Sequence, residues 1–156
     1  MAELLIRAVE GIPEIRPGDH LAAIVAERAD LEDHDVVVVT QKIVSKAENR
    51  LVDVGTDDPL AHKALVEREA VRILRRRGDL IITETSHGFV CANAGIDLSN
   101  MQAGVAALLP THPDRSARRI LDGLVAMTGR TLAVIVSDTF GRPWRRGLVD
   151  VAIGAA

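Results

Sequence analysis

The chain has 156 residues, of which 47% are hydrophobic and 2% aromatic, and its 19 basic and 22 acidic side chains give a net charge of −3. This length allows one domain with a substantial core of Val, Ile, Leu and Ala, and the charge balance argues against a domain whose whole surface binds nucleic acid. No apolar run approaches the ~18–20 residues that a membrane-spanning helix needs, and Cys91 is alone, so we predict a cytoplasmic protein without a membrane segment or an internal disulfide.

The first part of the chain predicts two strands around a short helix. The apolar residues 3–9 indicate a strand, which a turn rich in Gly and Pro follows. Asp19 is a suitable N-cap for a helix that reaches about Arg28. The unbroken valine run at residues 36–39 is typical of strands that are covered on both faces.

The middle of the chain predicts the longest helix. Asp58 and Pro59 are helix-start signals, and the arginines before Gly78 suit the C-terminal end of a helix that runs over residues 58–77. The remaining predicted elements are strands at 79–85 and 106–110, a loop at 86–100, a helix capped by Ser116 that ends at Gly129, and a strand at 131–136.

The last residues, 149–156, look like the start of another strand with nothing after it to pair with or cover it. This pattern favours a fragment of a longer protein, although a terminal edge strand has the same appearance.

Two short stretches carry oxygen ligands. The stretch NAGIDLSN places Asp97, Ser99 and Asn100 within four positions, in a pattern that an ordinary Asx-turn also uses. The stretch SDTFGRPWRRG places Asp138 and Thr139 directly after a strand predicted to be buried. A carboxylate beside a hydroxyl at a strand end suits Mg²⁺ or Mn²⁺, although Asp138 as the N-cap of a following turn is the alternative.

Basic side chains accompany both stretches. A metal held between Asp97 and Asp138 without His or Cys ligands would indicate phosphate chemistry, and phosphates need cations. Lys42 and Lys46 follow the valine run, and Arg142, Arg145 and Arg146 follow Asp138. A solvated surface has the same composition, and neither a Walker A sequence nor a Rossmann glycine pattern is present.

Five motifs then occur in one order: EGIPEIRPGD, DVVVVTQKIVSKAENR, GFVCANAGIDLSN, PDRSARRI, and SDTFGRPWRRG followed by DVAIG. In this order and spacing they resemble the coenzyme F420-0 gamma-glutamyl ligase family, from about Leu4 to the end of the chain. The resemblance implies an α+β fold, a mixed sheet with packed helices, in which residues 1–156 form the N-terminal portion of a ligase domain. Family members continue beyond DVAIG, and actinobacterial members add a flavin-binding, nitroreductase-like domain, so we expect this fold to be incomplete.

The resemblance also implies an activity and a set of site residues. Family members form homodimers and use GTP with Mg²⁺ or Mn²⁺ to join L-glutamate to F420-0. Metals would be held by Asp97, Asp138 and Thr139, while the three arginines Arg142, Arg145 and Arg146 would lie near an anionic substrate or phosphate. The residues implied around the nucleotide are Ile12, Pro13, Glu14, Ile15, Gln41, Lys42, Lys46 and Asn100.

Two other functions stay open from the sequence. A non-catalytic module would bind GTP or F420 without turnover, and a half-domain would act only together with a complementary chain. The general base for the glutamate amine is not identified by any motif.

Overall fold

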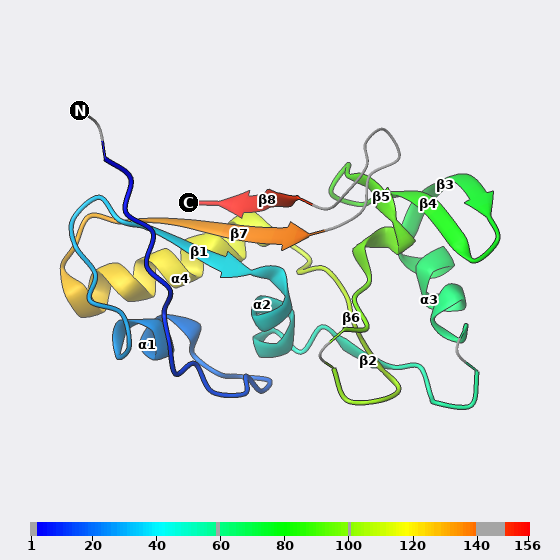
Figure 1. The fold of residues 1–156 in the computed structure, drawn as a ribbon, viewed down its shortest axis with the longest axis horizontal. Coiled ribbons are helices and arrows are strands. Elements are labelled where there is room, and N and C mark those ends of the chain that lie inside the picture. Colours follow the sequence, from blue (N-terminus) through cyan, green and yellow to red (C-terminus); the bar gives the residue numbers. More distant parts are fainter. Residues whose placement is uncertain (1–2, 59, 100, 140–148) are drawn as a thin grey trace.

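Two regions lie side by side along the longest axis of the chain, in a computed structural model that describes residues 3–58, 60–99, 101–139 and 149–156 (Figure 1). The first region, the sheet half, consists of α1 (Leu21–Ala26), β1 (Val36–Thr40), α2 (Gln41–Ala47), α4 (Pro113–Thr128), β7 (Ala133–Thr139) and β8 (Asp150–Ala155). The second region, the hairpin half, consists of β2 (Leu51–Asp53), α3 (His62–Glu69), β3 (Ala70–Arg77), β4 (Leu80–Thr85), β5 (Val90–Ala92), the short 3-10 helix η1 (Asn93–Gly95) and β6 (Val105–Ala107).

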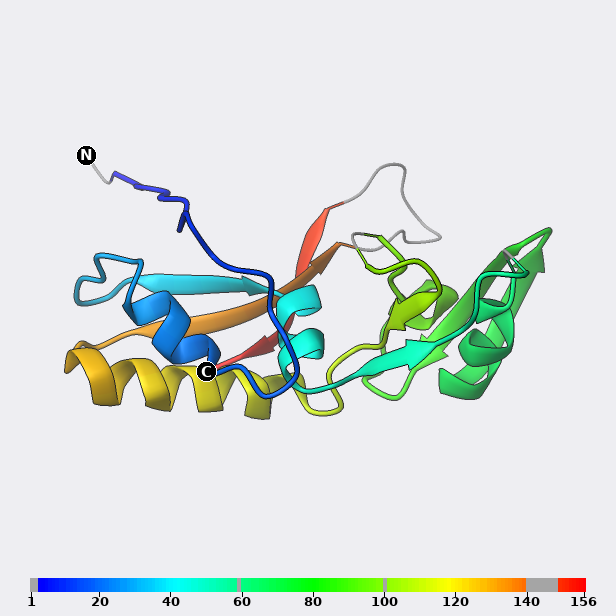
Figure 2. The same ribbon diagram turned by 90° about the horizontal axis from the view of Figure 1, so that it is seen from below.

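The sheet half contains a mixed three-stranded sheet in the order β1-β7-β8. The strands β1 and β7 are parallel, with Thr40 opposite Ser137, whereas β8 is antiparallel to β7 and places Asp150 opposite Thr139. Because parallel strands end at the same edge, the carboxyl ends of β1 and β7 and the first residue of β8 meet there. The helices α1 and α4 cover one face of this sheet (Figure 2), and the predicted α+β class with a mixed sheet and packed helices is confirmed.

The valine strand β1 is covered on one face only. Val37 and Val39 are buried, but Val36 and Val38 are 54% and 60% exposed, so the prediction of cover on both faces was wrong within the described chain. The two helices pack against one side of the sheet, and strict alternation along the strand therefore separates buried from exposed valines.

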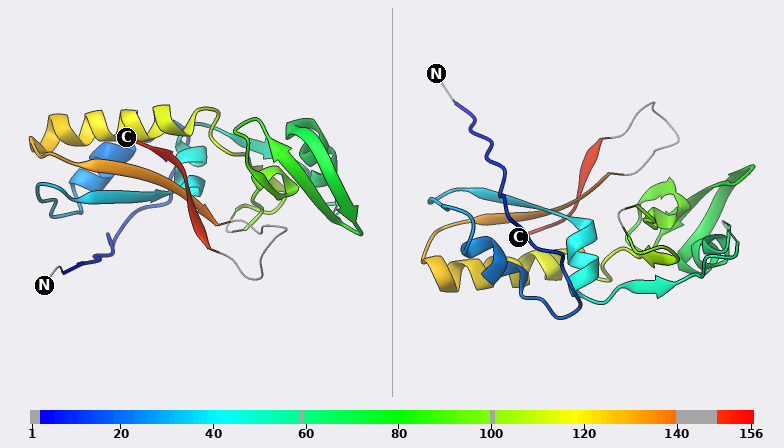
Figure 3. Two further views of the ribbon diagram at one scale, coloured as in Figure 1. Left: turned by 90° about the horizontal axis from the view of Figure 1, so that it is seen from above. Right: turned by 60° about the horizontal axis from the view of Figure 1, so that its bottom comes forward.

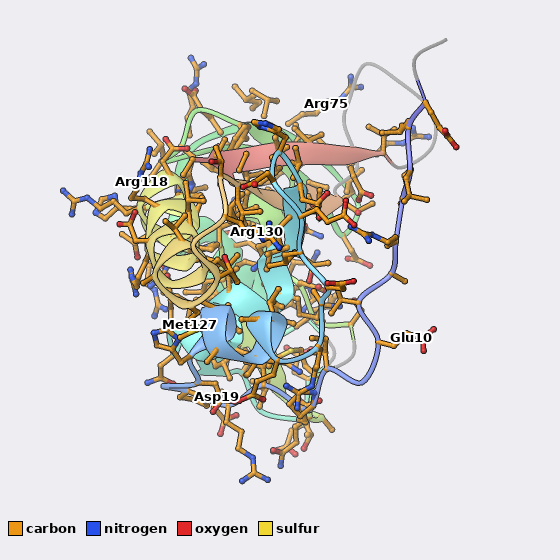
Figure 4. The ribbon with its side chains drawn as sticks, turned by 90° about the vertical axis from the view of Figure 1, so that its left-hand side faces the viewer. Glu10, Asp19, Arg75, Arg118, Met127 and Arg130 are labelled. Carbon is orange, nitrogen blue, oxygen red and sulfur yellow. The ribbon has the colours of Figure 1, made fainter. Side chains whose placement is uncertain are left out.

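The helix α4 presents an apolar stripe to the core, with Ala117, Ile120, Leu121 and Leu124 buried. Its other face points away from the body of the molecule, as Arg118 does in Figure 4. The helix ends at Gly129 as predicted, and this glycine has a left-handed backbone conformation. It begins at Pro113 rather than at Ser116, and Ser116 lies buried in its first turn and donates to the Glu48 carboxylate.

Two glycines allow α4 to approach its neighbours closely. A Cβ atom on Gly123 would lie 2.6 Å from the Ala22 Cβ of α1, and one on Gly154 would lie 2.4 Å from the backbone carbonyl carbon of Pro113. The strand β8 thus lies beside β7 with its end against α4 (Figure 3). The strand predicted over residues 149–156 is present as β8, which pairs antiparallel with β7.

The helix predicted over residues 58–77 is wrong in its second part, which forms a strand of the hairpin half. The helix α3 ends at Glu69, and the following residues form β3, which pairs antiparallel with β4. Arg77 lies opposite Leu80, so Gly78, at φ +57°, and Asp79 form a two-residue hairpin turn. Cross-strand pairing in the β3-β4-β5 sheet therefore overrides the helix signals of the arginine run.

Two further predictions concern the N-terminus and the membrane. Residues 3–9 were predicted to form a strand, but they have no regular structure, and Leu4 and Ile6 are both 84% exposed. An apolar run without a neighbouring strand to accept its hydrogen bonds does not form a sheet. Among the described residues, no helix has the length and apolar character needed to cross a membrane.

Candidate metal and nucleotide site

A cavity of about 630 Å³ lies where the strand ends of the sheet half face the hairpin half. The sheet half supplies Thr40, Gln41, Lys42, Asp138, Thr139 and Asp150 to its lining, and the hairpin half supplies Asn93, Asp97 and Ser99. Polar side chains from four separate stretches of sequence therefore share one hollow. The structure brings together five of the predicted site residues here, namely Gln41, Lys42, Asp97, Asp138 and Thr139.

Asp97 is held by the Asx-turn that the sequence allowed and also by a cation. Its Oδ1 accepts hydrogen bonds from the backbone N–H of Ser99 at 2.7 Å and from the Ser99 hydroxyl at 2.6 Å. Its Oδ2 lies 3.0 Å from the Lys42 ammonium, which also donates to Ser99 Oγ at 2.9 Å. Burial raises the pKa of Asp97, but the Ser99 hydrogen bonds and the Lys42 charge outweigh it and hold that pKa below its ordinary value.

The pKa of Asp138 is shifted in the opposite direction to that of Asp97. Burial is the main cause that raises the pKa of Asp138 to about 6, from an ordinary value of 3.8. A hydrogen bond from the Thr139 N–H at 2.9 Å and the charge of Lys42 offset part of this rise, whereas the carboxylates of Asp97 and Asp150 add to it. The cavity therefore holds more negative charge than Lys42 neutralises.

Asp150 is a site residue that the sequence analysis missed. As the first residue of β8 it lies opposite Thr139, whose hydroxyl donates a hydrogen bond to its carboxylate. Asp150 lies in the motif DVAIG, which carried the resemblance, but only the antiparallel pairing of that stretch with SDT places its carboxylate on the cavity. Its place depends on the register of β8 against β7, so no local sequence signal marks it.

Gln41 and Ser45 fasten α2 to the hairpin half. The Leu108 carbonyl accepts from Gln41 Nε2 at 3.0 Å and from the Ser45 hydroxyl at 2.6 Å, and all of these groups are buried. The carbonyl can only accept, which fixes the amide with Nε2 toward Leu108. Gln41 Oε1 is left without a partner, alone among the buried side-chain N and O atoms of the described residues. An unpaired buried acceptor beside a cavity is available to a water or to a ligand N–H.

The predicted nucleotide loop lies away from the cavity lining. Glu14 forms an ion pair with Lys46, one helical turn beyond Lys42 on α2. Ile15 is buried in the main core and Ile12 packs against it, while Pro13 is exposed. The structure therefore divides the predicted nucleotide residues between the cavity and a second place farther along α2.

Other candidates lie elsewhere or outside the described residues. Asn100, Arg142, Arg145 and Arg146 are not among the residues that the structure describes. His87 lines a separate cavity of about 200 Å³, and its Nε2 bonds to the Pro110 carbonyl. Cys91 is fully buried, as an inert thiol would be.

The donor atoms around the cavity fit a hard divalent cation in chemistry. They are carboxylate and hydroxyl oxygens. Burial is the main cause of the raised pKa of Asp138, and the nearby carboxylates of Asp97 and Asp150, whose repulsion a cation would offset, add to it. In the part of the chain that the structure describes, no three carboxylate, imidazole or thiol side chains are grouped closely enough to hold an ion by themselves. Mg²⁺ does not need such a group, because it binds through one or two carboxylates and completes its shell with water and phosphate oxygens.

Fold and site together define an α+β protein with an acidic, lysine-bearing cavity at the ends of its strands. Comparison with known sequences then gives the family, because the model of the F420-0:gamma-glutamyl ligase family matches residues 11–156. The chain belongs to this family.

Proteins named coenzyme F420:L-glutamate ligase are among its relatives. The protein of Methanothermobacter thermautotrophicus is 44% identical over 95% of this chain and 66% of its own length, and that of Methanopyrus kandleri is 42% identical over the same shares. The protein of Halobacterium salinarum is 44% identical over 96% of this chain and 65% of its own length. The chain thus spans just under two thirds of the length of these relatives.

Proposed function

We propose that the chain carries the reaction site of a ligase that joins L-glutamate to F420-0 by an amide bond and consumes GTP. Membership of the ligase family and the names of the relatives support the reaction class. The observation that carries the site is the convergence of Asp97 and Asp138 on one cavity, with the Lys42 ammonium bound to Asp97.

The proposed chemistry needs an activated carboxylate, because a carboxylate does not condense with an amine until one of its oxygens can leave. Transfer of the γ-phosphoryl group of GTP to a carboxylate oxygen of F420-0 would give an acyl phosphate and GDP. The glutamate amine would then attack the carbonyl carbon, which forms the C–N bond and releases inorganic phosphate and a proton. Both steps gather negative charge in one place, so catalysis depends on positioning and on charge stabilisation.

The carboxylates and the lysines would divide this work. Asp97, Asp138 and Thr139 would hold Mg²⁺ or Mn²⁺, which supplies positive charge against the phosphoryl oxygens. Lys42 and Lys46 lie four residues apart, and therefore on the same side of α2, so we propose that the nucleotide lies along this helix. Its path would run from the loop at residues 12–15 to the cavity, with Gln41 and Asn100 beside it.

Three further parts of the proposal rest on the resemblance. The basic residues Arg142, Arg145 and Arg146 would lie near the anionic substrate, and the protein would be cytoplasmic. It would act as a homodimer, for which the exposed apolar face of β1, with Val36 and Val38, offers a surface. Sedimentation equilibrium tests the dimer, since a monomer at all concentrations would contradict it.

Calorimetry with GTP and Mn²⁺ tests the site directly. We expect metal-dependent GTP binding by the wild-type chain and its loss in Asp138→Asn, which keeps the size of the side chain but removes the charge. The matched control is Asp122→Asn on the outer face of α4, which should bind like the wild type. Equal binding by Asp138→Asn and the wild type would contradict the placement of the metal.

A turnover assay separates the ligase from the alternatives. With F420-0, GTP, Mn²⁺ and L-glutamate, the ligase forms GDP and an F420 product whose mass rises by one glutamyl unit, and omission of either acceptor stops GDP release. GTP binding without turnover would favour a binding module. Turnover that appears only after a complementary chain is added would favour a half-domain.

A further inference from the structure

Lys42 occupies the place on Asp97 that a metal ion would need. The Ser99 N–H and hydroxyl take one carboxylate oxygen of Asp97, and the Lys42 ammonium takes the other at 3.0 Å. The side chains of Lys42 and Asp97 are only 21% and 24% exposed, so their attraction is screened less than that of a surface pair. A divalent ion that coordinates Asp97 must therefore displace the ammonium or share the carboxylate with it at short range.

Lys42 is also the basic side chain that faces the other carboxylates of the cavity, among the described residues that line it. Its charge acts on Asp138 as well as on Asp97, while Asp150 adds a third carboxylate on the same hollow. The other lysine of α2, Lys46, is engaged with Glu14 and is not part of the cavity lining. Among the described residues that line the cavity, the cation that compensates the carboxylates is therefore one flexible side chain, and it can move when a better anion arrives.

We propose that Lys42 excludes free divalent metal from Asp97 and admits it when a phosphate draws the ammonium away. Lys42 is then the residue that makes the site select a metal–nucleotide complex over the metal alone. Phosphate oxygens offer the ammonium an acceptor of higher charge than one carboxylate, and the freed Asp97 oxygen becomes a ligand. This inference rests on the proposed function in so far as it places the metal and the phosphates in the same cavity.

Mn²⁺ binding in the absence of nucleotide tests the proposal without any measurement of activity. Free Mn²⁺ is followed by electron paramagnetic resonance in titrations of the wild-type chain and of Lys42→Met, which keeps the aliphatic stem and removes the charge. We expect the variant to bind Mn²⁺ roughly tenfold more tightly, within the usual range of coupling between two sites. Equal or weaker Mn²⁺ binding by Lys42→Met would overturn the proposal.

Two variants control for charge and for folding. Lys46→Met makes the same change of net charge one helical turn away, on the lysine paired with Glu14, and should leave Mn²⁺ binding as in the wild type. Lys42→Arg keeps a cation at Asp97 and should also bind Mn²⁺ like the wild type. If Lys42→Met loses its helical circular dichroism, Lys42→Gln takes its place with the same expectation.

Addition of GTP distinguishes the inference from the proposed function. GTP should tighten Mn²⁺ binding in the wild type far more than in Lys42→Met, because only the wild type has an ammonium to remove. Tight Mn²⁺ binding by Lys42→Met together with no GTP binding by the wild type would support the exclusion and sink the proposed function. Metal-dependent GTP binding by the wild type, with no gain of Mn²⁺ affinity in Lys42→Met, would support the proposed function and contradict the exclusion of metal by Lys42.

Discussion

The sheet half and the hairpin half contribute to the same cavity but are stabilised in different ways. Most of the buried apolar side chains of the sheet half join one large cluster, which includes Leu124, Val134 and Val136. Among the described residues, the hairpin half adds two small clusters, centred on Leu65 and Val66 of α3. Since buried apolar area is the main stabilising contribution, the sheet half should resist unfolding more than the hairpin half does.

This difference bears on how each half holds its part of the site. Asp138 and Thr139 are fixed by the backbone ladders of β7, within the well-packed region. Asp97 is fixed by one bridge to Ala107, by Ser99 and by Lys42, so its position depends on local contacts and on the junction between the halves. The side of the cavity formed by the sheet half should therefore be rigid, whereas local unfolding in the hairpin half can move the side that carries Asp97.

The largest expected effect comes from the core of the sheet half. Leu124 is fully buried in α4, and Leu124→Ala should lower the free energy of unfolding by about 2–5 kcal/mol through lost burial and the cavity left behind. Urea denaturation followed by circular dichroism measures the change. The control is Val125→Ala, next to it on the same helix but 41% exposed, which should cost about 0.5 kcal/mol or less. Equal losses in both variants would mean that α4 is not packed as described.

The second effect is the pH dependence of folding stability that Asp138, in the sheet half, causes. Because its folded pKa of about 6 lies above 3.8, the folded chain keeps a proton between about pH 4 and pH 6 that the unfolded chain has released. The stability contributed by this group is present below pH 4 and is lost as pH rises to about 6. Asp138→Asn should therefore gain about 1–2 kcal/mol on the wild type between pH 4 and pH 7, after allowance for solvent screening.

Thermal and urea denaturation at several pH values measure this gain. Asp122→Asn, on the exposed side of α4, serves as the control and should follow the wild type at every pH. Parallel pH profiles for the wild type and Asp138→Asn would contradict the raised pKa. Asp97, whose pKa is lowered, changes stability with pH in the opposite direction. Because Asp97 is present in both the wild type and Asp138→Asn, its contribution cancels when the stability of one is subtracted from that of the other.

The sequence predicted the elements of the sheet half better than those of the hairpin half, and the reason is physical. The stripe of α4 and its final glycine are local signals, and the apolar runs of β1 and β7 are long enough to identify strands. The arginine run at residues 75–77 carries a helix signal, but its conformation is decided by pairing with β4 across the Gly78 turn. Such a tertiary contact is invisible to local propensity.

The site was predictable to a similar, limited degree. Asp138 and Thr139 at a strand end, and Asp97 in its turn, follow from sequence motifs, and the structure brings them to one cavity. The role given to Gln41 came from the resemblance, whereas Lys42 was also proposed from its charge as a partner for phosphates, and both roles stay predictions. Asp150 was missed because its place depends on the register of β8 against β7, which no local pattern specifies.

The third effect sits at the junction of the halves. Ser45→Ala removes one of the two donors to the buried Leu108 carbonyl, and should cost about 1–1.5 kcal/mol in unfolding free energy. Amide hydrogen exchange should also speed up in the hairpin half more than in the core of α4, because α2 then holds that half less firmly. Ser86→Ala, an exposed serine of the hairpin half, should change neither quantity. Unchanged exchange in Ser45→Ala would mean that the junction does not depend on this clamp.

The smallest expected effect tests whether exposed ion pairs between strands contribute much to the stability of the hairpin half. Arg72 on β3 bonds to the Glu84 carboxylate on β4 at 3.0 Å and 2.8 Å through two guanidinium nitrogens, but its side chain is 67% exposed. Exposed pairs contribute little, so Arg72→Ala should cost about 0.2–1 kcal/mol, and the cost should shrink in high salt. Urea denaturation at low and high salt measures it, with Arg118→Ala on the outer face of α4 as the control. A loss as large as that of Leu124→Ala would show that cross-strand charge pairs, rather than burial, hold the hairpin half together, and the contrast between the two halves would have to be drawn differently.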